Sequence, residues 1–156
     1  MTGDPFPLLL TPTCAECAGI GLPAILAMLW DMEDECGHDV LRAFLLAHGG
    51  RQISLPSRPL PELPGHPVNT AFRWLQAHVG YGKITVPSGP IAHSARLAWT
   101  IYHRLVQGQS LAEISAALHV HTRTVSNHRA RLISVGVVPE DIGAIQPRTH
   151  RKRNPQ

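Results

Sequence analysis

The segment TRTVSNHRARL, residues 122–132, carries side chains that can form hydrogen bonds with nucleic-acid bases. Arg123, Asn127 and Arg131 recur every four residues, which places them on one face of a helix. A guanidinium group can pair with guanine, and a carboxamide with adenine, each through two hydrogen bonds. We therefore expect this face to read bases in the major groove of double-stranded DNA. The predicted base-reading residues are Arg123, Thr124, Ser126, Asn127 and Arg131.

Two helices separated by a turn are predicted to present this face. Ser110, followed three residues later by Glu113, is the pattern in which each side chain caps an amide at a helix start. Apolar residues then follow at helical spacing as far as His119, which stands where the turn requires a left-handed backbone, and histidine is enriched there. Thr122 can cap the second helix through its hydroxyl. Residues 110–132 thus have the pattern of a helix-turn-helix.

The same pattern has a plainer interpretation, in which the polar residues are the solvated face of an ordinary helical hairpin. The distribution of charge favours DNA instead. Residues 90–156 contain nine Lys or Arg and three Asp or Glu, whereas residues 1–89 contain five basic and eight acidic side chains. The second part of the chain is therefore suited to a polyanion.

Phosphate contacts are expected around the base-reading face and from the basic C-terminal tail. A flexible, solubilising end is the alternative interpretation of this tail. The histidines at positions 119, 121 and 128 are predicted to contact phosphate or to pack, because they surround the turn and the second helix. The predicted phosphate-binding residues are Ser110, Thr122, Arg129, Arg151, Lys152 and Arg153.

Residues 91–107 have apolar side chains at helical spacing and are followed by Gly108. This is where the first helix of a three-helix DNA-binding domain is expected, directly before the other two. We predict a helix-turn-helix domain over residues 91–138, followed by the tail over residues 139–156.

Residues 22–90 contain one unit twice: a helix, a glycine, a short strand with alternating apolar residues, and a proline. Because a short isolated strand cannot satisfy its own backbone groups, the two strands pair either with each other or with those of a second subunit. The sequence leaves both alternatives open. At an offset of 31 residues the identities are Arg42 with Arg73, Gly49 with Gly80, Ile53 with Ile84, Pro56 with Pro87, Ser57 with Ser88 and Pro59 with Pro90.

Residues 41–56, LRAFLLAHGGRQISLP, resemble the helix, Gly-Gly, strand, Pro signature of the Mor family of phage middle-operon transcription activators. The similarity runs roughly over residues 22–132. The resemblance implies a prophage-type activator with a dimerisation region before its helix-turn-helix, which binds promoter DNA as a homodimer and helps host RNA polymerase to start transcription. It also implies that the strands contribute to dimerisation, through Ile53, Leu55, Ile84 and Val86.

Two features of this sequence differ from the patterns of the families that it resembles. The helix-strand unit occurs twice here, whereas the best-known members of the Mor family have one copy. The segment TRTVSNHRARL is also similar to the recognition helix of LuxR-type response regulators, but the Leu-Thr-x-Arg-Glu opening of that domain is absent before it. Both resemblances imply binding to DNA.

The three cysteines are the only candidates for a metal site. Cys14 and Cys17 form a Cys-x2-Cys half-site, and Cys36 precedes His38 by two residues, which is tighter than the usual zinc spacing. We therefore predict ordinary reduced cysteines and no cofactor, with a small zinc-stabilised protein or a redox Cys-x-x-Cys as alternatives. The sequence has no Gly-rich phosphate loop and no nucleophile beside a recognisable base, so we do not expect an enzyme.

No apolar run approaches the roughly 20 residues that cross a bilayer, and the N-terminus lacks the basic region of a signal peptide. We expect no membrane contact and a cytoplasmic protein. The predicted fold is mainly α with short β-strands: an irregular segment over residues 1–21, a helix-strand dimerisation region over 22–90, then the three-helix domain and the tail. The predicted function is sequence-specific transcription regulation, with a protein-interaction adaptor that does not read DNA as the alternative.

Overall fold

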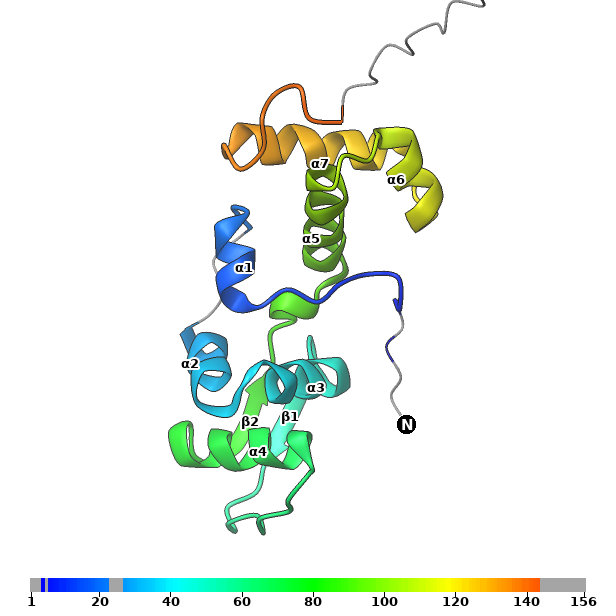
Figure 1. Cartoon of the computed structure of the whole chain (residues 1–156). Helices are drawn as coiled ribbons and strands as arrows, with labels where there is room; N and C mark the ends of the chain where they lie inside the picture. Colours follow the sequence, from blue (N-terminus) through cyan, green and yellow to red (C-terminus); the bar gives the residue numbers. More distant parts are fainter. Residues whose placement is uncertain (1–3, 5, 23–26, 144–156) are drawn as a thin grey trace, which may run out of the picture.

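The computed structural model describes residue 4, residues 6–22 and residues 27–143 (Figure 1). In this part of the chain, seven α-helices and one short 3-10 helix accompany a two-stranded antiparallel sheet. The predicted fold class, mainly α with short β-strands, is confirmed. None of the helices in the described ranges is long and apolar enough to span a membrane.

The buried side chains form two hydrophobic cores. One core lies between the sheet and the helices α2 to α4, and we call residues 27–91 the body. The other lies among α5, α6 and α7, and we call residues 93–143 the head. The elements are α1 (Cys14–Gly19), α2 (Ala27–Cys36), α3 (His38–His48), β1 (Gln52–Leu55), α4 (Pro67–His78), β2 (Gly82–Thr85), η1 (Gly89–Ile91), α5 (His93–Val106), α6 (Leu111–Leu118) and α7 (Thr122–Ser134).

The strands β1 and β2 pair with each other within the chain, which answers the question that the sequence left open. Their register places Ile53 opposite Ile84. Ile53, Leu55 and Val86 are buried in the core of the body, and Ile84 packs against that core. These four side chains pack within their own chain, and the contribution to dimerisation that the Mor resemblance implied for them stays a prediction.

The helices of the two units correspond at an offset of 30 residues, not 31. The buried positions are Leu41, Phe44 and Leu45 in α3, and Ala71, Trp74 and Leu75 in α4. The inward-facing residues of the strands correspond at 31, Ile53 with Ile84 and Leu55 with Val86, although each strand begins four positions after the last residue of its helix. The identities of Arg42 with Arg73 and of Gly49 with Gly80 therefore do not mark equivalent positions.

The N-terminal segment, predicted to be irregular, contains the helix α1. The Thr13 hydroxyl accepts a hydrogen bond from the Glu16 N–H at 3.1 Å, and the Glu16 carboxylate accepts one from the Thr13 N–H at 3.0 Å. This is a complete capping box. Because Cys14 lies in the core of the body and Ile20 in the core of the head, α1 joins the two.

Candidate nucleic-acid interface

The three helices of the head are held by one core. Figure 1 shows α7 lying across one end of α5, with α6 beside it, while the sheet lies at the opposite end of the molecule. On α7, Val125 and Leu132 form the inward-facing stripe and are 0% and 2% exposed. They pack with Ile114 of α6 and Ile101 of α5. This core fixes which face of α7 points outward.

The turn between α6 and α7 is closed by polar contacts. His119 has φ 55° and ψ 41°, the left-handed conformation expected for it. The Ser115 hydroxyl donates a hydrogen bond to the Val120 carbonyl. The Thr122 hydroxyl in turn donates one to Ser115 Oγ at 3.4 Å. These contacts tie the end of α6 to the start of α7, which sets the angle at which α7 is presented.

Two of the predicted caps differ in the structure. The residue before α7 is His121, which makes no side-chain cap, so the cap predicted for Thr122 is wrong. Ser110 does cap α6, since its hydroxyl accepts a hydrogen bond from the Glu113 N–H at 3.2 Å. In the described part of the chain, however, the Glu113 side chain does not return the bond. Ser110 is partly exposed and Thr122 is exposed, so their phosphate contacts stay a prediction.

The outward face of α7 carries the predicted base-reading residues. Arg123, Asn127 and Arg131 are exposed, and Thr124 and Ser126 beside them are partly exposed. None of the first three side chains has a hydrogen bond or an ion pair with any described residue. Their polar groups are therefore available to an external ligand. A row of two guanidinium groups and one carboxamide on a helix has the hydrogen-bonding groups that base edges in the major groove require.

Arg129 has a structural role that the sequence did not indicate. Its Nε donates a hydrogen bond to the Ile142 carbonyl, and its terminal nitrogen donates one to the Glu140 carbonyl at 2.6 Å. These bonds hold the segment after α7 against the head, where Val138 is buried. Arg129 is partly exposed, and its phosphate contact stays a prediction. Arg151, Lys152 and Arg153 lie outside the described residues.

Arg96 of α5 is a structural residue that the sequence did not reveal. Only 1% exposed, it donates hydrogen bonds to both carboxylate oxygens of Asp4 at 2.7 Å. It also donates to the carbonyls of Phe6 and Leu9. The N-terminal segment is thereby fastened across α5. A buried arginine needs such partners, but Asp4 is too distant along the chain for a local pattern to indicate it.

Asp4 also connects the head to the body. Its carboxylate accepts a hydrogen bond from Arg42 of α3 at 3.0 Å. The hydrogen bond from Arg96 is the main cause that lowers the pKa of Asp4 from 3.8 to about 2. Asp4 is therefore charged under all physiological conditions, and the contact among the N-terminal segment, α3 and α5 persists.

Among the histidines near the interface, His128 is the one that packs. It is partly buried on α7, and burial, followed by the charges of Arg131 and His93, lowers its pKa below 6.5. It is therefore mostly neutral at pH 7. His119 and His121 are exposed at the turn, where the predicted phosphate contact stays a prediction.

The cysteines are placed as apolar core residues. Cys14 and Cys17 are both 0% exposed, and burial raises their pKa values to about 12 and about 11. They are therefore thiols at neutral pH. His38 Nδ1 lies 3.3 Å from the Glu33 carboxylate. Within the described residues, no three His, Cys, Asp or Glu side chains are grouped to hold a metal ion.

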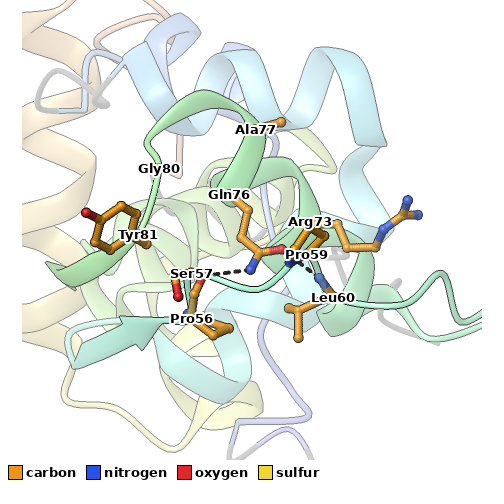
Figure 2. Close-up of a pocket in the computed structure, with 9 residues that line it drawn as sticks. All are labelled: Pro56, Ser57, Pro59, Leu60, Arg73, Gln76, Ala77, Gly80 and Tyr81. Atoms are coloured by element: carbon orange, nitrogen blue, oxygen red, sulfur yellow. Dashed lines mark hydrogen bonds between the residues drawn. The ribbon is translucent and has the colours of Figure 1, made fainter.

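A pocket of about 350 Å³ lies in the body, between α4 and the segment that follows β1 (Figure 2). Gln76 holds this segment: its amide nitrogen donates to the carbonyls of Pro56 and Arg58, both at 2.9 Å, and its oxygen accepts from the Leu60 N–H at 3.1 Å. The pocket lining contains no carboxylate, histidine or cysteine.

The family model described as "Bacterial regulatory proteins, luxR family" matches residues 98–134. The match runs from the middle of α5 to the last residue of α7. Comparisons with curated proteins and with solved structures gave no match. The head is thus similar to a LuxR-type helix-turn-helix, which supports a DNA-binding transcription regulator. The Mor resemblance of residues 41–56 stays a prediction.

Proposed function

We propose that this protein is a sequence-specific transcription regulator that inserts α7 into the major groove of DNA. The observation that carries the proposal is the exposed row of Arg123, Asn127 and Arg131, which has no partner among the described residues. This row lies on the second helix of a LuxR-type helix-turn-helix. Thr124 and Ser126 add hydrogen-bonding groups at its edge. Phosphate contacts from Ser110, Thr122 and the basic tail would fix the register of the helix on the duplex.

The length of the row sets the size of the site. Arg123 and Arg131 are eight residues apart, which corresponds to about 12 Å along a helix. At roughly 3.4 Å per base pair, one α7 covers about four base pairs. So short a half-site cannot specify a promoter, and we propose that two copies bind as a homodimer to half-sites about one helical turn apart.

The direction of regulation is proposed from the resemblance to the Mor family. In this proposal the protein is a prophage-type activator that acts in the cytoplasm with host RNA polymerase. Polymerase contact can be tested by transcription in vitro from a promoter that contains the selected site. Stimulation of initiation supports the activator, and unchanged or reduced initiation contradicts it.

The test of DNA binding begins with selection of bound sequences from a random duplex pool, followed by gel shifts on the selected site. We expect Arg123→Ala and Asn127→Ala each to lose about 1 to 3 kcal/mol of discrimination, or roughly 5- to 150-fold. Arg58→Ala is the matched control, because Arg58 is also exposed but lies in the body. Unchanged base preference in both α7 variants would refute the proposal.

Salt dependence separates this function from a protein-interaction adaptor. A protein that neutralises several phosphates loses affinity steeply between low and physiological salt. An adaptor that uses the helix pair only for packing does not bind duplex DNA at either salt concentration.

A further inference from the structure

The pairing of β1 with β2 has the pattern of a twofold axis. The inward-facing residues of the strands correspond at an offset of 31 residues, and Ile53 lies opposite its own counterpart, Ile84. On either side, Gln52 pairs with Thr85 and Ser54 pairs with Lys83. Every antiparallel pair of strands has a local twofold relation of this kind; here the axis passes between the two equivalent isoleucines. Identical strands from two subunits would pair in this way around a symmetry axis.

The helices α3 and α4 have equivalent aromatic pairs. In α3 the ring of Phe44 lies 5.7 Å from that of His48, and in α4 the ring of Trp74 lies 4.1 Å from that of His78. Both pairs occupy the same positions at the offset of 30.

The ends of these helices also match. The Gly49 N–H donates to the Leu45 carbonyl at 2.7 Å, and the Val79 N–H donates to the Leu75 carbonyl at 2.7 Å. A glycine with positive φ follows each, Gly50 at 74° and Gly80 at 100°. The duplication therefore extends from the helix core to the backbone turn before each strand.

We propose that the body is an internal pseudo-dimer, in which the two units of one chain make the contacts that two subunits would otherwise make. The core between the sheet and the helices is complete within one chain. The inward side chains of both strands then pack against this core, and the free protein is a monomer.

The surface of the sheet supports this inference. Its outer face consists of polar, exposed residues, namely Gln52, Ser54, Lys83 and Thr85. Both strands have four residues and are followed closely by a proline, Pro56 or Pro87. Short strands, lysine and proline are features that prevent edges from pairing with another chain.

The rest of the body offers little apolar surface for a partner. Its exposed large hydrophobic residues, within the described ranges, are Leu63, Val79 and Tyr81. A stable subunit interface buries about 1,200 to 2,000 Å² around an apolar centre. These few side chains do not provide one.

The arrangement has a consequence for DNA binding, and this consequence alone rests on the proposed function. Two identical subunits would carry two heads on one symmetric body, but here the duplicated body leads through η1 to a single head. The free chain therefore presents one α7, and two copies come together when DNA supplies adjacent half-sites.

Disulfide trapping tests the inference in the full chain. Gln52 and Thr85 are direct cross-strand partners with exposed side chains, so Gln52→Cys with Thr85→Cys can form a disulfide. Cys36, which is partly buried, is replaced by Ala, while the buried Cys14 and Cys17 remain. We expect the oxidised double variant to migrate as a monomer on a non-reducing gel and to lose both new thiols. Gln52→Cys alone, the control, should form no disulfide.

Sedimentation of the unmodified chain gives the second measurement. We expect a mass of 17.0 kDa over the micromolar concentration range. A disulfide between chains, no disulfide in the double variant, or a stable dimer of the free chain would each overturn the inference. If the double variant forms its disulfide within the chain and the unmodified chain is a monomer that does not bind DNA, only the proposed function is contradicted.

Discussion

Replacing Asp4 by Asn should weaken the joint between head and body. Asp4 accepts charge-assisted hydrogen bonds from Arg96 and Arg42, and its pKa is lowered from 3.8 to about 2. At about 1.4 kcal/mol per pKa unit, and with some reduction because the side chain is partly solvated, this corresponds to roughly 2 kcal/mol of stability. We expect Asp4→Asn to lower the free energy of unfolding at pH 7 by about this amount.

The pH dependence of the loss identifies its cause. Because the folded pKa lies below the unfolded one, the stabilisation is complete above about pH 5 and is lost as the pH falls through 3.8 towards 2. Urea unfolding of the wild type and the variant should therefore converge between pH 5 and about 2.5. Asp34→Asn, at an exposed position of α2, is the control and should change little. Equal stability of Asp4→Asn and wild type at pH 7 would refute the reasoning.

Three further predictions concern the head and the cysteines. His119→Gly should increase the free energy of unfolding by about 0.5 kcal/mol and raise the thermal midpoint. Glycine relieves the left-handed strain at φ 55°, although it loses more chain entropy on folding. A lower midpoint contradicts this prediction. Arg129→Ala should lower the free energy of unfolding by about 1 to 3 kcal/mol, because the Ile142 and Glu140 carbonyls lose their donor. The Arg129→Ala variant should show the same salt dependence of DNA binding as the wild type. A smaller salt slope in the variant would indicate that Arg129 contacts phosphate. Cys14 and Cys17 should resist a thiol reagent in the native protein at pH 8, with pKa values raised to about 12 and about 11, and react after unfolding; rapid native reaction of all three cysteines would contradict their placement.

Local sequence patterns were sufficient to predict the helix-turn-helix. The Ser110 cap, the left-handed turn at His119 and the inward stripe of Val125 and Leu132 each depend on residues close together in the chain. For the same reason, the Thr13–Glu16 capping box could have predicted α1, although the proline-rich and glycine-rich context of that segment favoured an irregular structure.

Contacts between distant residues could not be predicted in this way. Arg96 forms hydrogen bonds with Asp4, which lies 92 residues earlier in the chain. Arg129 donates to carbonyls of a segment without regular structure. The choice between strand pairing within or between chains also depended on three-dimensional packing. The helix correspondence at 30 residues was hidden because the inward-facing strand residues and the prolines after them correspond at 31.

The central claim is that α7 reads DNA through its exposed row, and base preference at the selected site tests it most directly. Measured side by side, Arg123→Ala and Arg58→Ala should differ: the first should relax the preference at one position of the half-site by roughly 5- to 150-fold, and the second should bind as the wild type does. If Arg123→Ala and Asn127→Ala both retain the full base preference of the wild type, α7 is not the reading helix.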